Sequence, residues 1–443
     1  MPLPVACDPW ALETLTSYVR IPSVSAQGRG IDESCEFLSR TFAGLGFRVE
    51  RIATAGHPVL LAERVAPGAR RSIVFYNHYD VQPPEPLELW SSPPFETVVR
   101  DGRIWGRGVA DNKANLIVRL AAVRDLLARR PDLPVTLRFL VEGEEEIGSP
   151  NLGAFVATHL HRFRSDLCIW ENGARTLDGR LELILGCKGV LHLELALHSL
   201  GADQHSSRGA ILPSAPWRLV WVLAGLKDAD ERVRIQGFYD PVRATTPADR
   251  EVLAQIPFDE AALRAQYGAR GWLGGRTGID LRHRLFCEPA VNINGLTSGY
   301  QGKGNKTVLP SSASAKLDVR LVPDQTPEGV RSLLRGHLDR SGFPDVEITH
   351  AQGYPPARTP VDHPIIRRVA RAAEAATGKT PVPIPMMPAS GPMYLFADHM
   401  PLVGVGTGNP DSRAHAPDEN ITVEDFRLGQ EVIVHLLEEM AGD

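Results

Sequence analysis

The stretch SIVFYNHYDVQP, residues 72–83, decides how the chain is interpreted. Its first six residues form a short β-branched and aromatic run, which is typical of a buried strand. The run ends on His78 and Asp80, which lie two residues apart and share a face if the strand continues. A ligating imidazole is usually oriented by a carboxylate on its other ring nitrogen, so this pair suits a metal site. On these residues alone, an ordinary polar strand end is the alternative.

Strands and helices alternate around this stretch, which indicates an α/β layer with a largely parallel sheet. Residues 115–130, NLIVRLAAVRDLLARR, have helical periodicity and end in basic residues. Thr422 and Asp425 are expected to form a capping box for a last helix over residues 423–440. Further buried strands are expected at residues 134–143, 166–170 and 401–406.

The middle of the chain has a different pattern. Residues 189–199 and 314–323 alternate apolar with polar side chains, and 326–340 reads as a helix with proline in its first turn. Amphipathic strands with helices predict an α+β insert in which one sheet face is covered and the other exposed. The expected fold class is therefore α/β: a hydrolytic domain with a mixed, mostly parallel sheet, plus an inserted α+β lid or dimerisation domain. The expected boundaries are residues 1–187 and 355–443 for the first domain and 188–354 for the insert.

Length and composition exclude several classes of protein. A chain of 443 residues is too long for one core, so two domains are expected. The net charge of -5 and the lack of a basic block argue against a nucleic-acid partner. No run is long and apolar enough to span a membrane, and residues 1–15 lack the features of a signal peptide. Five scattered cysteines fit free thiols in a reducing cytoplasm: Cys7, Cys35, Cys168, Cys187 and Cys287.

Carboxylates follow two of the expected strands. Asp111, in GRGVADNKAN, directly precedes a helix, where it could be an N-cap or a metal-bridging carboxylate. In VEGEEEIGS, residues 141–149, a strand runs into three adjacent glutamates, which repel one another unless a cation is present. A solvated charge run is the alternative, but open α/β sheets place ligands at the carboxyl ends of strands.

Two further groups complete a possible ligand set. Glu171 follows another apolar strand, and His415 lies in a loop beyond the strand at 401–406. Imidazoles with carboxylates suit divalent zinc, manganese or cobalt. The chain has no CxxC, HExxH or GxSxG motif, and the glycine-rich residues 299–307 lack the spacing of a phosphate-binding loop.

As an ordered set, NHYDVQP, GRGVADNKAN, EGEEEIGS, WENG, DQHSS and AHAPDE resemble the zinc aminoacylase and dipeptidase family. That family includes carnosinase-like cytosolic dipeptidases, acetylornithine deacetylase, succinyl-diaminopimelate desuccinylase and glutamate carboxypeptidase. The resemblance implies two divalent metal ions, zinc first, with manganese or cobalt as alternatives. It implies that Asp111 bridges them, with His78 and Glu171 on one ion and Glu146 and His415 on the other.

The resemblance also implies catalytic roles. Glu145, directly before the ligand Glu146, is the expected general base, and Asp80 orients His78. His205, in GADQHSS, matches a lid histidine that stabilises the oxyanion and often comes from the partner subunit, so a homodimer is expected. Candidate substrate contacts are Thr307, Arg320, Ser390 and, more weakly, His363.

The chain departs from the carnosinase-like pattern in places. Glu171 stands where that branch usually has aspartate, Asn112 replaces a second aspartate, and PMMPA precedes Ser390. The expected function is metal-dependent hydrolysis of an amide bond in a small peptide with a free carboxylate, as a dipeptidase. The alternatives are an N-acyl-amino-acid deacylase or carboxypeptidase and, ranked lower, a non-catalytic relative. The sequence leaves the natural substrate and the native metal open.

Overall fold

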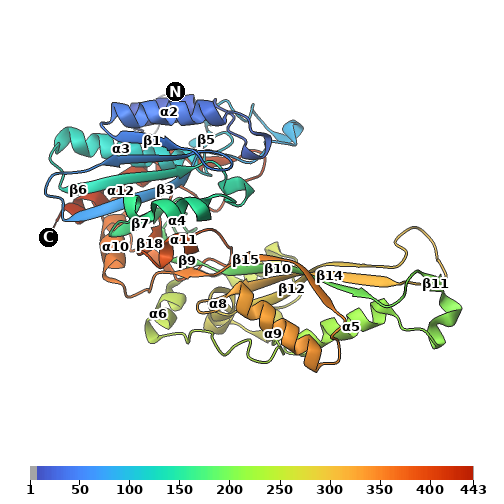
Figure 1. Cartoon of the computed structure of the whole chain (residues 1–443). Helices are drawn as coiled ribbons and strands as arrows, with labels where there is room; N and C mark the ends of the chain where they lie inside the picture. The colour runs from blue at the N-terminus through green and yellow to red at the C-terminus, as the bar shows by residue number, and fades with distance from the viewer. Residues whose placement is uncertain (1–6, 443) are drawn as a thin grey trace.

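The structure, a computed structural model, describes residues 7–442, so part of the segment examined for a signal peptide lies outside it. Figure 1 shows a large α/β body and an elongated second body that projects from it. The expected fold class, a mixed α/β sheet domain with an inserted α+β domain, is confirmed.

The large body is built on one mixed sheet whose centre is parallel. Strand β3 (Arg71–His78) pairs in parallel with both of its neighbours, β6 (Val135–Glu142) and β7 (Leu167–Trp170). All strands predicted for this sheet are present, within a few residues of their expected ends. The remaining strands are β1 (Arg48–Ile52), β2 (Val59–Arg64), β8 (Glu182–Ile184), β17 (Val382–Ile384) and β18 (Leu402–Gly404).

The middle of strand β3, residues 73–76, is apolar because it is buried on both faces. Ile73 and Phe75 join one core, whereas Val74 and Tyr76 join the other. The helices of the first core are α1 (Pro9–Val19), α2 (Ile31–Gly44), α3 (Lys113–Arg129), α10 (Pro364–Thr377) and α12 (Val423–Ala441). The second core receives α4 (Leu152–Phe163) and α11 (Tyr394–Ala397).

Two helix starts refine the sequence expectations. Helix α3 begins at Lys113, and its N-cap is Asn112 rather than Asp111, which leaves the Asp111 carboxylate free of that role. Thr422 does cap α12 by accepting a hydrogen bond from the Asp425 amide at 2.9 Å. The predicted capping box is only half formed, because the Asp425 carboxylate pairs with Arg175 instead.

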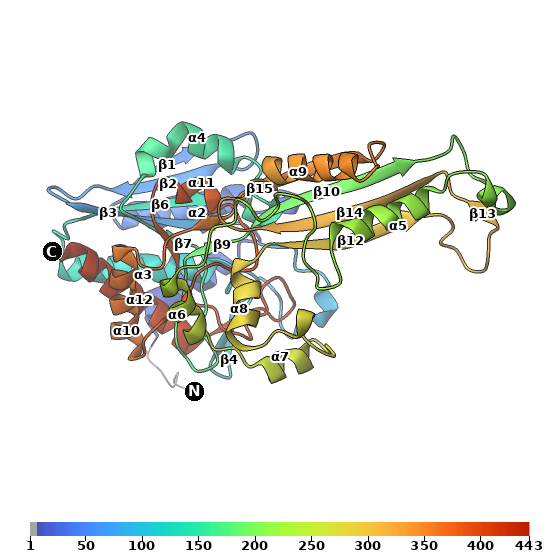
Figure 2. The same cartoon turned by 90° about the horizontal axis from the view of Figure 1, so that it is seen from below.

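The second body, the lid, contains a four-stranded antiparallel sheet in the order β12, β14, β10, β15. These strands are β12 (Ala290–Ser298), β14 (Ser312–Leu321), β10 (Gly189–His198) and β15 (Glu347–Tyr354). Helices α5 (Ala215–Leu226) and α9 (Pro327–Arg340) cover one face, as the alternating pattern predicts. Two short strands lie at the lid tip, far from the large sheet: β11 (Gln204–His205), labelled in Figure 1, and β13 (Val308–Leu309), labelled in Figure 2.

Short elements join the two bodies. The chain leaves the large body through β9 (Gly186–Cys187) and returns through β16 (Ala357–Arg358), and these two strands pair with each other. Three helices that were not predicted lie between α5 and β12: α6 (Pro247–Gln255), α7 (Glu260–Gln266) and α8 (Gly278–Cys287). A small sheet in the large body contains β4 (Val98–Arg100), β5 (Arg103–Trp105) and β19 (Asn420–Thr422).

Within residues 7–442, no helix combines the length and the apolar character that crossing a membrane requires. All five cysteines are free thiols.

Candidate metal centre

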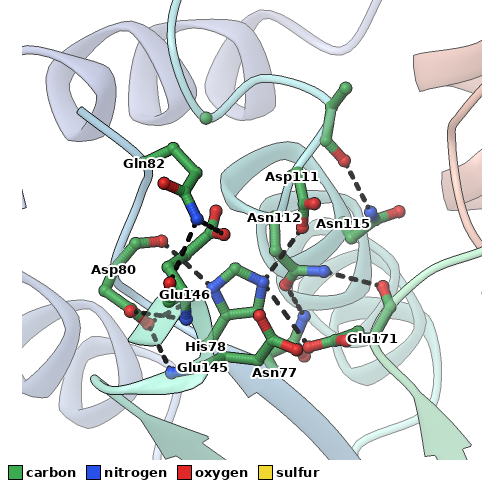
Figure 3. Close-up of polar contacts among 12 residues, drawn as sticks. Asn77, His78, Asp80, Gln82, Asp111, Asn112, Asn115, Glu145, Glu146 and Glu171 are labelled. Atoms are coloured by element: carbon green, nitrogen blue, oxygen red, sulfur yellow. Dashed lines mark hydrogen bonds and ion pairs between the residues drawn. The ribbon is translucent and has the colours of Figure 1, made fainter. Parts of the chain in front are cut away.

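His78 closes strand β3 at its carboxyl end and is fully buried. Its Nε2 lies 3.0 Å from Oδ1 of Asp111 and 3.5 Å from Oε2 of Glu171. Figure 3 shows these side chains converging from β3, from the loop before α3 and from the end of β7. The parallel sheet therefore gathers groups that are distant in sequence, as strand-end placement predicts.

A second imidazole faces the other side of Asp111. Nε2 of His415 lies 3.2 Å from Oδ2 of Asp111 and 3.1 Å from Oε2 of Glu146. The two oxygens of Asp111 thus point at two different imidazoles. Asp111, His78 and Glu146 each offer one ligand atom within 4.8 Å of the other two.

The residues present fit a cation. Oε1 of Glu146 and Oε2 of Glu171 are buried and have no hydrogen-bond partner within residues 7–442, although His78 lies within ion-pair distance of Glu171. Burial and the neighbouring Glu145 carboxylate raise the pKa of Glu171 well above its usual range. Carboxylate oxygens left without partners in a buried site are costly, and a bound divalent cation removes that cost.

Asp80 supports the site differently from the sequence expectation. Nδ1 of His78 is 3.0 Å from the backbone carbonyl of Asp80 and 3.4 Å from its carboxylate. The carboxylate instead accepts the backbone N–H groups of Glu145, at 3.3 Å, and Glu146, at 3.0 Å. Asp80 therefore fixes both the imidazole and the turn that carries the glutamates, and Nε2 is the nitrogen of His78 that faces the other candidate ligands.

The adjacent glutamates have separate environments. The Glu144 carboxylate accepts hydrogen bonds from Nδ2 of Asn151, at 2.8 and 3.1 Å, and from the amide of His57, at 3.1 Å. The Glu145 carboxylate has no hydrogen-bond partner among the described residues, and burial raises its pKa to about 8. Glu144 is thus held as a structural group, while Glu145 is left available for proton transfer.

Two supporting residues lie in the motifs quoted above but were not predicted. Gln82 donates through Nε2 to Oε2 of Glu146, at 2.9 Å, and to its backbone oxygen, at 3.0 Å. The buried Glu419 carboxylate accepts the amide of Asp111 at 3.0 Å and pairs with Arg107 at 2.7 Å. Gln82 could have been found from its position two residues after Asp80, which places it on the same face of an extended chain. Nothing in the sequence marks Glu419 except that it ends the motif AHAPDE.

Two buried donors hold the strand ends together beneath the candidate ligands. The Arg119 guanidinium donates to the backbone oxygens of Tyr76 at 2.9 Å, Trp170 at 2.5 Å and Val405 at 3.0 Å. Burial lowers the pKa of Arg119 to about 9, which still leaves it charged at neutral pH. Asn112, at the position where the resembling family has aspartate, donates through Nδ2 to the backbone oxygen of Glu171 at 2.9 Å.

The residues named as substrate contacts fall into separate places. Nη1 of Arg320 on β14 donates to Oγ of Ser390 in the large body, at 2.9 Å, so these two meet where the bodies join. His205 and Thr307 lie together at the exposed lid tip, with Nε2 and Oγ1 3.5 Å apart. His363 caps α10 by accepting the Ile365 amide at 3.2 Å. Within this chain, the lid tip is therefore not beside the metal ligands (Figure 1).

Comparison with known proteins gives consistent matches. Residues 74–439 match the family described as Peptidase family M20/M25/M40. The solved structure of Sso-CP2, an M20 family metallo-carboxypeptidase from Sulfolobus solfataricus, is similar with a TM-score of 0.87 and 35% identity, covering 98% of this chain and 99% of that one. Beta-Ala-His dipeptidase of Rattus norvegicus is 27% identical over 332 residues, which is 73% of this chain and 67% of the relative. Cys-Gly metallodipeptidase dug1 of Schizosaccharomyces pombe is 27% identical over 344 residues, 74% of this chain and 72% of the relative.

Proposed function

The chain belongs to peptidase family M20/M25/M40, and on that premise we propose that it is a metal-dependent dipeptidase acting on small peptides with a free carboxylate. The observation that carries the proposal is the cluster around Asp111, whose two carboxylate oxygens face His78 and His415 separately. Relatives named as dipeptidases support the substrate class.

The proposed ligands follow this two-sided arrangement. His78 and Glu171 would hold one divalent ion, Glu146 and His415 the other, and Asp111 would bridge them. Two such ions, when bound, polarise an amide carbonyl and lower the pKa of water. Zinc is the first expectation for this donor set, with manganese or cobalt as alternatives.

The protein's own residues perform the proton transfers in this proposal. Glu145 accepts a proton from the attacking water and returns it to the leaving amine, since its carboxylate is free and its raised pKa suits exchange near neutral pH. Asp80 holds the Glu145 backbone, which keeps the base in position. General acid–base catalysis by one such group contributes roughly 10²- to 10⁴-fold.

Substrate contacts are proposed for both bodies. Arg320 and Ser390 would hold the substrate carboxylate, since a guanidinium suits a carboxylate and their hydrogen bond already joins the bodies. His205 would donate to the developing oxyanion, with Thr307 beside it. His363 is a weaker candidate because its imidazole already caps α10.

A homodimer is proposed because His205 lies far from its own chain's metal ligands. The lid exposes a large apolar surface on α5 and on the edge strand β12: Trp217 is 61% exposed, Trp221 55% and Leu296 63%. Apolar patches of this kind mark protein interfaces. A second copy docked on this surface could bring its lid tip to the first copy's ligands. Five free thiols support a cytoplasmic location.

Carboxypeptidase activity is the second candidate. The observation that favours it is the similarity to Sso-CP2, a metallo-carboxypeptidase at 35% identity. A carboxypeptidase would also need a clamp for the free carboxylate, so Arg320 and Ser390 fit both activities. The activities differ in whether the substrate extends beyond one residue on the amino side of the cleaved bond.

Turnover assays test the proposal. The protein, supplied separately with zinc, manganese and cobalt, is assayed on unblocked dipeptides, N-acetyl amino acids and amino-terminally blocked tripeptides. Cleavage of unblocked dipeptides at the highest kcat/KM supports the proposal. Preference for the blocked tripeptides selects a carboxypeptidase, and activity on N-acetyl amino acids alone selects a deacylase. A protein that binds fewer than one divalent ion per chain and cleaves nothing would be the non-catalytic relative.

A further inference from the structure

A row of side chains crosses the lid sheet at the end nearest the large body. Val190 on β10 lies directly opposite Arg320 on β14 and opposite Tyr354 on β15. Residues directly opposite in antiparallel strands project to the same face, so these three side chains stand side by side. Their neighbours Leu191 and Val319 pack under helices α5 and α9, so the row lies on the opposite face of the sheet, which these helices do not cover.

Two tyrosines meet at one end of this row. The ring of Tyr354 stacks on that of Tyr394, which begins α11 in the large body, with centroids 5.5 Å apart and planes 6° apart. At the other end of the row, Arg320 bonds Ser390. Val190, 2% exposed, separates the two ends. The row therefore places an aromatic pair, a buried valine and the Arg320 guanidinium in sequence, with contacts to the large body at both ends. Nε and Nη2 of Arg320 also pair with the Asp318 carboxylate, at 3.0 and 3.1 Å, and Nη1 is directed at Ser390.

Tyr354 of this pair lies in electrostatic range of both Glu145 and Arg320. Burial raises the pKa of Tyr354, Cys187 and the Glu145 carboxylate raise it further, and the Arg320 guanidinium acts in the opposite direction. In a dipeptide, only one residue separates the cleaved carbonyl from the terminal carboxylate, and one residue spans about 3.8 Å between α-carbons. The side chain of that residue must therefore project beside whatever lies between the base and the clamp.

We propose that Tyr354 and Tyr394 form the wall that contacts the side chain of the substrate's carboxy-terminal residue, and that they select an aromatic side chain there. The inference rests on the proposed function, because it places Glu145 at the cleaved bond and Arg320 at the carboxylate. Two rings already stacked offer a rigid apolar face at low cost in conformational entropy. A third ring in contact with such a pair adds about two- to tenfold in affinity beyond the effect of its buried area.

The test measures binding without turnover. Metal-loaded Glu145→Gln protein is titrated by calorimetry with the dipeptides Ala-Phe and Ala-Gly. We expect Ala-Phe to bind about tenfold more tightly than Ala-Gly, from ring contact and buried area together. Adding Tyr354→Ala or Tyr394→Ala should bring the two affinities close together while leaving Ala-Gly nearly unchanged. Tyr354→Phe should keep the preference, because the ring and not the hydroxyl makes the contact.

Controls separate this wall from a general structural role. Tyr267→Ala, at a tyrosine that is 66% exposed in the lid, should leave both affinities unchanged. If Tyr354→Ala does not fold, Tyr354→Leu keeps the apolar volume and removes the ring. Equal losses for both dipeptides, an unchanged preference, or no binding of either dipeptide would overturn the inference. Failure of the proposed function looks different: the unsubstituted protein then cleaves no dipeptide although the tyrosine-dependent preference persists.

Discussion

The cluster of side chains around Asp111 and the lid tip hold their candidate residues in opposite ways. His78 is fully buried and its imidazole is fixed on both nitrogens. His205 is exposed, and its neighbours are Ser207 at 2.8 Å and Thr307 at 3.5 Å, both also on the surface. One site is assembled by a sheet within a single chain, whereas the other presents its groups outward. The proposed homodimer requires this difference, because only side chains that face outward can reach a second copy of the chain.

The largest expected effect comes from removing the proposed base while the proposed metal ligands stay in place. Glu145→Gln should lower kcat by about 10³-fold, because the amide cannot accept the proton from water. Metal content should remain unchanged, since Glu145 is not among the proposed ligands. Steady-state kinetics on a cleaved dipeptide, with metal analysis of the same samples, measures both. Retained turnover would remove Glu145 from the role of base.

The next largest expected effect concerns His205 at the lid tip. His205→Ala should lower kcat by roughly 10²- to 10³-fold with little change in KM, which is the size expected for a lost oxyanion donor. Ser206→Ala is the matched control on the same exposed turn, because the hydrogen bond that Ser206 makes among the described residues comes from its backbone N–H, to the Thr307 carbonyl at 3.1 Å, and this variant should stay near the unsubstituted rate.

Mixing the two variants asks whether the tip acts on the partner subunit. Glu145→Gln and His205→Ala proteins are inactive for different reasons, so a mixed dimer that shares residues across subunits contains one complete site. Turnover should therefore reappear after subunit exchange. If exchange is demonstrated and no turnover returns, the tip does not complete the partner's site.

A third prediction concerns protons at the cluster. The hydrogen bonds to Asp111 and Glu146 raise the pKa of His415 to about 10 in the metal-free protein, so this imidazole is protonated at neutral pH. A metal ion needs the neutral imidazole and must displace that proton. Metal affinity should therefore rise with pH, by about tenfold per pH unit for one proton released.

Calorimetric titration of the metal at pH 6, 7 and 8, in buffers of different ionisation enthalpy, counts the released protons. His205→Ala should show the same dependence, since the exposed tip is not part of the cluster. An affinity that does not change over this range would mean that the ion does not displace a proton from His415.

The cluster was accessible from sequence because its positions follow from local pattern. An apolar run that ends on a polar group marks a strand end, and parallel strands bring such ends to one edge of a sheet. His78, Glu146 and Glu171 could be recognised in this way, with family resemblance adding their roles. Arg119 could not, because a cation inside a helix carries no sign that three strand ends will converge on it.

Contacts between distant segments could also not be predicted from the sequence. The spacing of His78 and Asp80 predicted a carboxylate–imidazole contact, but the nearer contact is the backbone carbonyl, because backbone N–H groups occupy the carboxylate. The stacking of Tyr354 on Tyr394 depends on how the lid meets the large body. No local periodicity encodes that geometry.

The smallest expected effect sharpens the contrast within the glutamate run itself. Glu144 differs from Glu145 because its carboxylate is saturated by Asn151 and His57, and it packs so closely on Gly56 that a Cβ there would lie 1.9 Å from Oε1. Glu144→Gln places an amide N–H against the Asn151 donor, so the free energy of unfolding should fall by about 1.5–3 kcal/mol, the range for a hydrogen bond to a charged group.

Urea unfolding of the metal-free proteins measures this change in the free energy of unfolding, with the exposed Glu88→Gln as a control that should stay at the unsubstituted value. Because Glu144 only holds the turn, kcat should change far less than in Glu145→Gln. A variant of normal stability with lost turnover would reverse the assignment of the two glutamates.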